Sequence, residues 1–299
     1  MPRVTVIMPA RNEAQRIGDN LSKLSESTFR DFDVLVVDDA STDDTAAVAR
    51  RAAAARGLAL RVIRLPQLGG PAAAANIASQ HTEAELLFFC DGDCAPDSDW
   101  IAQGVAALSA PGVCAVEGAV YYAESRPSFR HRVPLNPFYN LTRRGPLTVP
   151  GTDYANGNFA VRREVFVHLG GFNARRYAYG REDTDLGLRL RTCGRIAYAA
   201  DMRVLHQAEY WTFGTLLRNA RRYAADVRIF KDHGDFIFRR GRILHPRFLA
   251  ELLCPPLIPL RYRPRSAAEW LFVPQFYLYL MALRVVIWHS AAREGVLVL

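Results

Sequence analysis

The chain has 299 residues, of which 50% are hydrophobic and 23% charged, so it is long enough for one large globular domain or two. Its formal net charge is +8, and arginine supplies nearly all the positive charge because Lys23 and Lys231 are the only lysines. Guanidinium groups suit phosphates, although a general bias toward arginine and alanine would explain this charge equally well. The chain carries no helix-turn-helix, zinc-finger or RNP-type pattern, which argues against nucleic acid and favours an anionic membrane surface or a pyrophosphate-containing substrate.

The five cysteines form no C-x-x-C pair, so the sequence suggests neither a disulfide framework nor a zinc site, and a reducing compartment fits best. The N-terminal apolar run is too short for a signal peptide and continues directly into a strand pattern. We therefore expect a cytoplasmic protein, either free or peripherally bound at the inner face of the cell membrane.

The first 80 residues alternate between predicted strands and helices. Strands are expected at 4–8, 32–37 and 60–65, with helices around Ile17, Leu21 and Leu24, after the second strand, and over 72–79. This rhythm is typical of a parallel sheet with right-handed crossovers. There is no G-x-G-x-x-G after the first strand and no P-loop motif anywhere, which argues against a dehydrogenase or a P-loop ATPase.

The second strand ends in an acidic, hydroxyl-rich turn. Asp38 and Asp39 open this turn, and Ser41 or Thr42 is the expected N-cap of the next helix. The two carboxylates either contact a nucleotide base or ribose or serve as capping residues, and this stretch alone favours capping.

The strongest chemical signal is the pair Asp91 and Asp93, which follows the continuous apolar run 86–90. Such a run predicts a buried strand, and open α/β sheets bind ligands beyond the carboxyl ends of their strands. Two hard oxygen donors there predict a Mg²⁺ or Mn²⁺ site, since these ions require only one or two protein carboxylates. The D-x-D spacing by itself is weak evidence, because short acidic pairs commonly belong to turns or caps.

After this pair we expect a helix over 96–108 and a strand over 113–122, followed by an irregular, substrate-facing segment over 123–149. Asn156 and Gly157 predict a turn before a short apolar strand, and a simple hairpin corner is a strong alternative to any binding role. Short strands are expected again at 196–199 and 204–206, where His206 alone would more often be an ordinary core or surface residue.

A second acidic group lies at the start of a predicted helix that ends near Leu190. Its first turn carries Glu182, Asp183 and Asp185. Carboxylates at a helix N-terminus are stabilised by the helix dipole and stay ionised, as a general base requires. Acidic first turns are also ordinary helix starts, so the helix alone does not identify a base.

The last quarter of the chain is basic and apolar. We expect a basic amphipathic helix over 211–230 and apolar runs at 248–260 and 271–288, separated by arginines. The second run contains Pro274, Gln275 and Arg284, whereas a membrane span needs about 20 clean apolar residues. Residues 236–290 therefore predict interfacial or re-entrant helices in peripheral contact with a membrane, or alternatively a soluble helical subdomain or a homo-oligomer interface.

Taken together, these stretches resemble the family 2 glycosyltransferases. The resemblance runs from Val4 to Tyr223 and rests on motifs in a fixed order: VTVIMPARNE, VVDDASTDDT, GGPAAAANIA, DGD, NGNFAVRR, GREDTDLGLRLRTCG and the later His206. It implies the α/β GT-A (nucleotide-diphospho-sugar transferase) fold, a mostly parallel sheet flanked by helices with a helical C-terminal extension. The implied catalytic domain is 1–210, with a donor half about 1–122 and an acceptor half about 150–210, followed by the region 211–299.

The resemblance also implies an activity and a partner set. The activity is inverting transfer of a sugar from a nucleotide-diphosphate donor to an acceptor hydroxyl, with Mg²⁺ or Mn²⁺ on the diphosphate. The acceptor would be a glycan, a lipid-linked molecule or a small molecule, as in the synthesis of cell-surface glycans or lipid-linked saccharides. The multiple membrane spans of many processive polymerases are missing from the sequence, which favours one sugar added per encounter.

The family roles carry over by position. Asp183 matches the catalytic base, with Glu182 beside it, and the implied metal ligands are Asp93, Asp91 and His206. The implied donor-binding residues are Pro9, Arg11, Glu13, Asp38, Asp39, Asn76, Asp91 and Arg222. The implied acceptor-binding residues are Asn156, Gly157, Asn158 and Tyr223. Ala75 and Ala78 depart from the arginine and glycine common in the family, which puts one donor contact in question.

Two other functions remain open at this stage. A sugar-phosphate nucleotidyltransferase could share a related fold, but the loop after Met8 reads PARNE instead of the glycine- and basic-rich loop that grips a nucleoside triphosphate. A non-catalytic scaffold that binds a glycan or another subunit would not need both Asp93 and Asp183.

Overall fold

The structure is a computed structural model that describes residues 2–122, 133–134, 157–178, 180–206, 210–211, 214, 217, 220–234, 253–254 and 267–296. The chain divides into two compact units. The first comprises residues 1–123 and 145–207, and the second comprises 124–144 and 208–299. Apart from 133–134, the predicted segment 123–149 lies outside the described residues, as does most of the apolar run 248–260.

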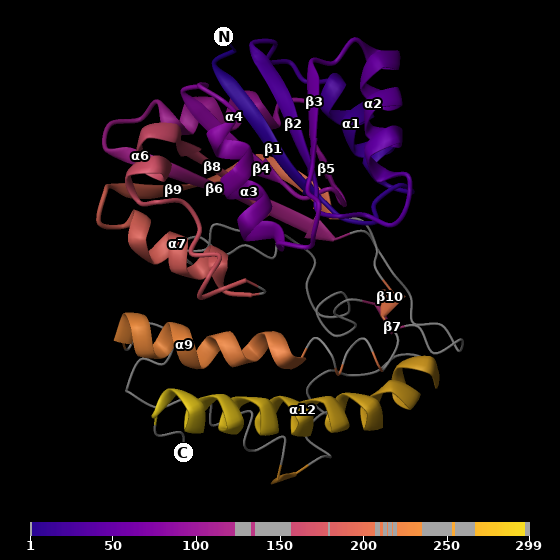
Figure 1. The fold of residues 1–299 in the computed structure, drawn as a ribbon, viewed down its shortest axis with the longest axis vertical. Helices are drawn as coiled ribbons and strands as arrows, with labels where there is room; N and C mark the ends of the chain where they lie inside the picture. The colour runs from indigo at the N-terminus through magenta and orange to yellow at the C-terminus, as the bar shows by residue number, and fades with distance from the viewer. Residues whose placement is uncertain are drawn as a thin grey trace. The chain divides into compact units, whose positions relative to one another are not determined.

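The first unit is built on an eight-stranded sheet in the order β3-β2-β1-β4-β8-β6-β9-β5 (Figure 1). The pairs from β3 to β4 and the pair β6–β9 are parallel, while β4–β8, β8–β6 and β9–β5 are antiparallel. The α/β class is confirmed, with a sheet that is mixed in its second half. The strands are β1 Val4–Ala10, β2 Phe32–Asp38, β3 Leu60–Arg64, β4 Leu86–Cys90, β5 Cys94–Pro96, β6 Val113–Tyr122, β8 Asn158–Arg162 and β9 Arg195–His206.

Helices cover both faces of this sheet. On one face α1 (Ile17–Ser25), α2 (Thr45–Arg56) and α4 (Trp100–Leu108) share a core with alternate strand residues such as Phe88. On the other face α3 (Pro71–Gln80), α6 (Arg163–His168) and α7 (Glu182–Leu190) share a second core that includes Phe89. Because both faces are covered, the central strands are continuously apolar, as their sequences predict.

Three sequence-based boundaries differ from the structure. The helix expected from Pro96 begins only at Trp100, because 94–96 form the edge strand β5 against β9. The two short strands expected at 196–199 and 204–206 are one strand, β9, whose register with β6 shifts between Gly118 and Ala119. The helix α2 begins at Thr45, so the N-cap expected at Ser41 or Thr42 is wrong; the Thr45 amide donates to Asp43 Oδ1 over 3.0 Å.

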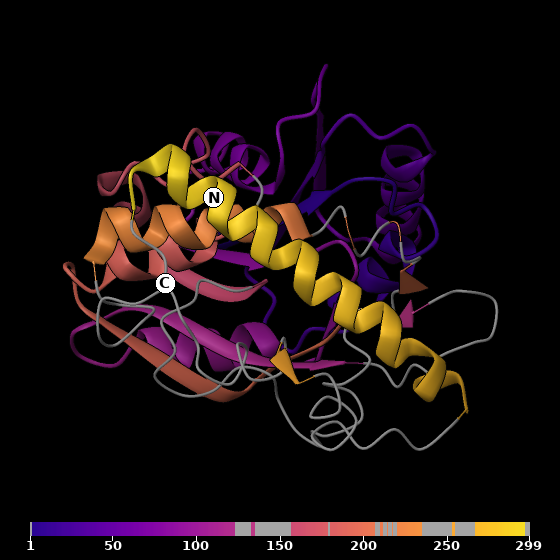
Figure 2. The same cartoon turned by 90° about the horizontal axis from the view of Figure 1, so that it is seen from below.

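The second unit contains the antiparallel pair β7 (Val133–Pro134) and β10 (Tyr210–Trp211), the 3₁₀ helix η1 (Arg221–Tyr223), α9 (Ala224–His233) and α12 (Ala267–Glu294). The helices α9 and α12 pack against each other, with Val227 and Ala291 buried together (Figure 2). The amphipathic helix predicted over 211–230 is described only in part: Gly214, Leu217 and Ala220 are helical, and η1 and α9 follow them. Among the described helices, including the 28-residue α12, none has the length and apolar character needed to cross a membrane.

Candidate active site

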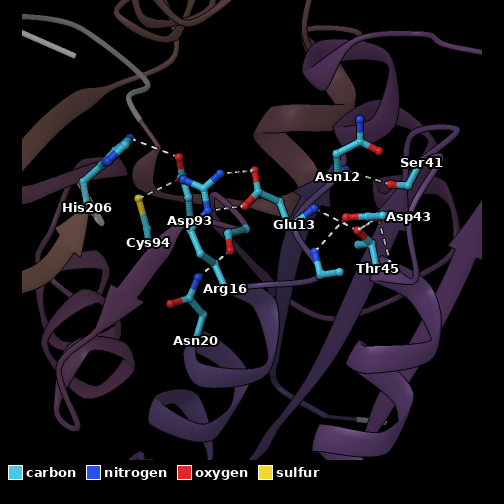
Figure 3. A network of polar contacts seen from close by, with 12 residues as sticks. Asn12, Glu13, Arg16, Asn20, Ser41, Asp43, Thr45, Asp93, Cys94 and His206 are labelled. Atoms are coloured by element: carbon cyan, nitrogen blue, oxygen red, sulfur yellow. Dashed lines mark hydrogen bonds and ion pairs between the residues drawn. The ribbon is translucent and has the colours of Figure 1, made fainter. Parts of the chain in front are cut away.

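The loops that follow β1 and β2 are bonded to each other at the carboxyl end of the sheet (Figure 3). The Asn12 amide donates to Ser41 Oγ over 3.0 Å, and the Glu13 amide donates to Thr45 Oγ1 over 2.8 Å. Asn12 has a φ of 57°, and Ala40 has a φ of 53°. Left-handed backbone at non-glycine residues is uncommon and costs free energy, so the surrounding bonds hold these loops in a fixed shape.

Asp38 and Asp39 are both buried, with 0% and 4% of their surface exposed. Asp38 Oδ1 accepts the Ser41 amide over 2.9 Å, and its other oxygen lies 3.6 Å from Arg64 Nε. The Asp39 carboxylate accepts the amides of Gly69 and Gly70 over 2.7 and 2.8 Å, just before α3. Their described contacts hold the loops after β2 and before α3, and neither aspartate caps α2. Their contact with a donor stays a prediction.

The two aspartates of the D-x-D motif diverge. Gly92 between them packs against the β1 loop, since a Cβ there would lie 3.3 Å from both Ala10 and Glu13, and its carbonyl accepts the Asn20 side chain. Asp93 points toward His206, whereas Asp91 lies against Gly157, where any Cβ would overlap the Asp91 carboxylate. Gly157 is therefore the residue that leaves room for Asp91.

Asp93, His206 and Cys94 form a group of three ligand-type side chains whose ligand atoms all lie within 4.8 Å of one another. His206 Nε2 is 3.3 Å from Asp93 Oδ2, because the antiparallel register of β5 and β9 sets Cys94 opposite His206 (Figure 3). The Cys94 thiol donates to Asp93 Oδ1, and burial raises the pKa of this thiol well above its usual value. The carboxylate oxygen of Asp93 and the imidazole nitrogen of His206 are a pair that fits a divalent cation.

The second acidic group forms the first turn of α7. Arg181 precedes it with a φ of 68°, and Glu182 accepts the Gly180 amide over 2.8 Å. Burial, and then the charges of Asp183 and Asp91, raise the pKa of Glu182 to about 7. Asp185 Oδ2 lies 2.6 Å from Arg189 Nη2, and this ion pair one turn apart stabilises α7.

Asp183 is held at Oδ1 by the Thr184 amide over 2.7 Å. Burial raises the pKa of Asp183, while the positive charge of Arg181 and the hydrogen bonds from Thr184 oppose that rise. Desolvation therefore opposes the helix dipole at Glu182 and Asp183, and the expectation that both carboxylates stay ionised stays a prediction. A carboxylate with a raised pKa is a better proton acceptor, provided it is ionised at the working pH.

Glu117 on β6 joins this acidic group and was not among the candidates that sequence reasoning identified. It is 2% exposed, and burial followed by the charge of Asp183 raises its pKa to about 8. The available signal was a single carboxylate inside the otherwise apolar strand VCAVEGAVYY.

Two predicted ligand-binding asparagines make structural contacts. Asn158 is fully buried: it accepts a hydrogen bond from Trp100 Nε1 and donates to the carbonyls of Ala119 and Met202, and its contact with an acceptor stays a prediction. Asn76 both donates to the carbonyl of Phe172 and accepts its amide, over 2.8 Å each. These asparagines connect segments that are distant in sequence, and the donor contact of Asn76 stays a prediction.

The other predicted residues are distributed as follows. Pro9 lies within β1, Arg11 is exposed in the following loop, and the Glu13 carboxylate is 2.8 Å from Arg16 Nε. Asn156 lies outside the described residues. Arg222 and Tyr223 belong to η1 in the second unit, and their contacts with diphosphate and acceptor stay predictions.

Comparison with protein families gives two matches. A model described as "Glycosyl transferase family 2" matches residues 5–170, more than half of the chain. A second, described as "N-terminal domain of galactosyltransferase", matches residues 144–209.

Among curated proteins, glycosyltransferase AglE of Haloferax volcanii is 35% identical over 124 residues, which are 41% of this chain and 40% of AglE. Poly(ribitol-phosphate) beta-N-acetylglucosaminyltransferase TarS of Staphylococcus aureus is 34% identical over 96 residues, 31% of this chain and 16% of TarS. The chain thus spans less than half the length of these relatives.

Among solved structures, the mannosyltransferase PcManGT from Pyrobaculum calidifontis in complex with GDP-Man and Mn²⁺ has a TM-score of 0.62 at 22% identity, covering 96% of this chain and 87% of PcManGT. S. aureus TarS 1-349 in complex with UDP-GlcNAc has a TM-score of 0.55 at 17% identity, covering 98% and 92%. At these identities the likeness concerns the fold.

Proposed function

The chain belongs to glycosyl transferase family 2 and has the GT-A fold, and on that premise we propose that it transfers a sugar from a nucleoside-diphosphate donor to an acceptor hydroxyl with inversion, assisted by a divalent metal. The observation that carries the proposal is the divergence of Asp91 and Asp93. One aspartate of the motif lies beside His206, a candidate metal position, and the other lies against Gly157, near enough to α7 for its charge to raise the pKa of Glu182. Inversion places the base and the leaving diphosphate on opposite sides of the anomeric carbon, so a base and a metal on the diphosphate would come from separate segments.

Asp93 and His206 would hold the metal, preferably Mn²⁺ or Mg²⁺. When bound, the cation neutralises negative charge that grows on the leaving diphosphate. The two solved structures with donor sugars, one of them with Mn²⁺, support a donor of this type. Asp39, Asn76 and Arg222 are proposed as further donor contacts.

Asp183 is proposed as the base. Its carboxylate takes the proton of the acceptor hydroxyl while the acceptor oxygen bonds to the anomeric carbon; the bond from that carbon to the diphosphate oxygen breaks, and its electron pair leaves with the diphosphate. Proton removal by a positioned carboxylate contributes typically about 10²- to 10⁴-fold. Burial raises the pKa of Asp183, which favours its protonation as the transfer proceeds.

We further propose that residues 1–210 form the catalytic domain and that the C-terminal region 211–299 contacts a membrane surface peripherally on the cytoplasmic side. The exposed face of α12 supports the latter point: Trp270, Leu278 and Trp288 are 54%, 50% and 51% exposed. Tryptophan at both ends of an exposed apolar face suits an interfacial helix. A lipid-linked acceptor and a single addition per encounter follow from this arrangement.

The test is release of nucleoside diphosphate from a panel of UDP-, GDP- and TDP-sugars with Mn²⁺ or Mg²⁺, repeated after chelation. We expect metal-dependent release from one donor and a loss of about 100-fold or more in Asp93→Ala, since a metal contributes several kcal/mol. Asp201→Ala is the matched control, because Asp201 is an exposed carboxylate of β9 paired only locally with Arg203. Release of pyrophosphate would identify a nucleotidyltransferase, and the absence of turnover and of metal-dependent donor binding would identify a scaffold.

A further inference from the structure

Glu117 lies on the face of the sheet that packs against α7. It follows Ala115 by two residues on β6, so both side chains point to the same face. Ala115 shares a core with Leu186 of α7, and Phe159 of β8, the partner of Glu117 in register, belongs to the same core. Glu182 and Asp183 lie one turn before Leu186, toward the helix N-terminus.

The surroundings of Glu117 disfavour its ionised form. Its Oε1 atom is buried and has no hydrogen-bond partner among the described residues, and no described arginine or lysine forms an ion pair with it. The charged groups of the neighbouring elements are Asp183, Glu182 and Arg181 at the start of α7 and Asp91 at the end of β4; the titratable residue in register on β9 is Tyr198. Three of these four charged groups are carboxylates, so an ionised Glu117 would meet repulsion as well as desolvation.

We propose that Glu117 is a positioning residue for the transfer: a neutral carboxylic acid beneath α7 that leaves Asp183 as the carboxyl group that ionises and accepts the acceptor proton. This inference rests on the proposed function. Two interacting carboxyl groups release their protons in separate steps. Glu117 is 2% exposed and Asp183 is only partly buried, so Glu117 is the group that keeps its proton. Glu117 neither gains nor loses a proton during a turnover, and its neutrality spares Asp183 a repulsive neighbour.

The first test compares Glu117→Gln, which keeps the shape, the neutrality and a hydrogen-bond donor, with Glu117→Ala. We expect the alanine variant to lose about tenfold in kcat with little change in the donor KM, because removing a buried side chain from the core beside α7 lets the turn that carries the base shift. Glutamine should restore most of that loss at neutral pH. In the unchanged chain kcat should decline above a pH of about 8, as Glu117 ionises beside Asp183, and this decline should be absent from the glutamine variant.

The second test needs no substrate. The pKa of Glu117 is about 8 in the folded chain, far above the ordinary glutamate value, so the unfolded chain releases this proton first as pH rises. Relative to Glu117→Gln, the unchanged chain should therefore lose thermal stability as the pH rises from about 5 to about 8. The difference in Tm between the two chains should reach at least about 3 °C and stay constant above a pH of about 8. Glu164→Gln, at an exposed glutamate of α6, should show no such gap.

The outcomes separate the two proposals. The role of Glu117 would be overturned if Tm depended on pH in the same way for Glu117→Gln and for the unchanged chain. It would also be overturned if the alanine variant kept the kcat and the pH profile of the unchanged chain. Either result would leave the proposed transferase activity intact. A chain that shows the stability gap but transfers no sugar from any donor would overturn the proposed function, and the role of Glu117 with it.

Discussion

Replacing Asn158 by alanine should destabilise the first unit by about 3–5 kcal/mol. The Asn158 side chain makes three buried hydrogen bonds: from Trp100 Nε1 over 2.7 Å, to the Ala119 carbonyl over 2.9 Å and to the Met202 carbonyl over 2.7 Å. Each buried polar group that loses its partner costs about 1–3 kcal/mol, and the lower half of that range applies where a carbonyl keeps a bond within the sheet. This loss is a large fraction of the free energy of unfolding, which is about 5–15 kcal/mol for a typical folded protein.

The assay is urea unfolding, monitored by tryptophan fluorescence. The urea concentration at the unfolding midpoint should fall, while the slope of the unfolding free energy against urea concentration should stay the same. Asn173→Ala is the matched control, because Asn173 is exposed and accepts a single local bond of 3.2 Å, so it should cost about 0.5 kcal/mol at most. A double-mutant cycle with Trp100→Phe should give a coupling of about 1 kcal/mol. A cost below about 1 kcal/mol for Asn158→Ala would refute the idea that this side chain fastens β8 to β6 and β9.

Three further predictions follow from individual contacts. Gly157→Ala should lower kcat for sugar transfer at least about tenfold, because the added methyl group overlaps the Asp91 carboxylate; unchanged kinetics would show that Asp91 can move without consequence. Asn76→Ala should lower stability by about 2 kcal/mol in the same urea assay, since it removes both bonds to the loop after α6; a cost near zero would mean that the loop does not depend on them. A thiol reagent should modify Cys193 and Cys254 quickly in the native chain and the other three cysteines only after unfolding, because those three are buried and burial raises their pKa; a third fast thiol would contradict the described packing.

Elements buried on both faces were predictable from sequence. The strand over 86–90 and the strand over 113–122 have the boundaries that their apolar runs predict, because a strand covered by helices on both sides admits few polar residues. The three-residue strand β5 was missed, because so short a segment ending in Pro96 has no periodicity to detect. The polar residues around Asp201 made β9 look like two strands, where the structure has one irregular strand.

The candidate site was predictable in its residue types and less so in its arrangement. Asp93 and His206 lie close together only because β5 pairs with β9, and no local sequence spacing encodes that pairing. The helix dipole suggested ionised carboxylates on α7, but the depth of burial, which opposes that expectation for Glu182, depends on the packing of the whole unit. Glu117 was overlooked because its environment is contributed by a distant helix.

The position of His206 on β9 has a consequence for how the candidate cation site responds to a ligand. His206 is the partner in register of Cys94 on β5 and of Tyr122 on β6, so its backbone has a neighbouring strand on each side. A side chain carried by such a strand is held more precisely than one carried by a loop. The separation of His206 and Asp93 should therefore be nearly the same before and after a cation binds.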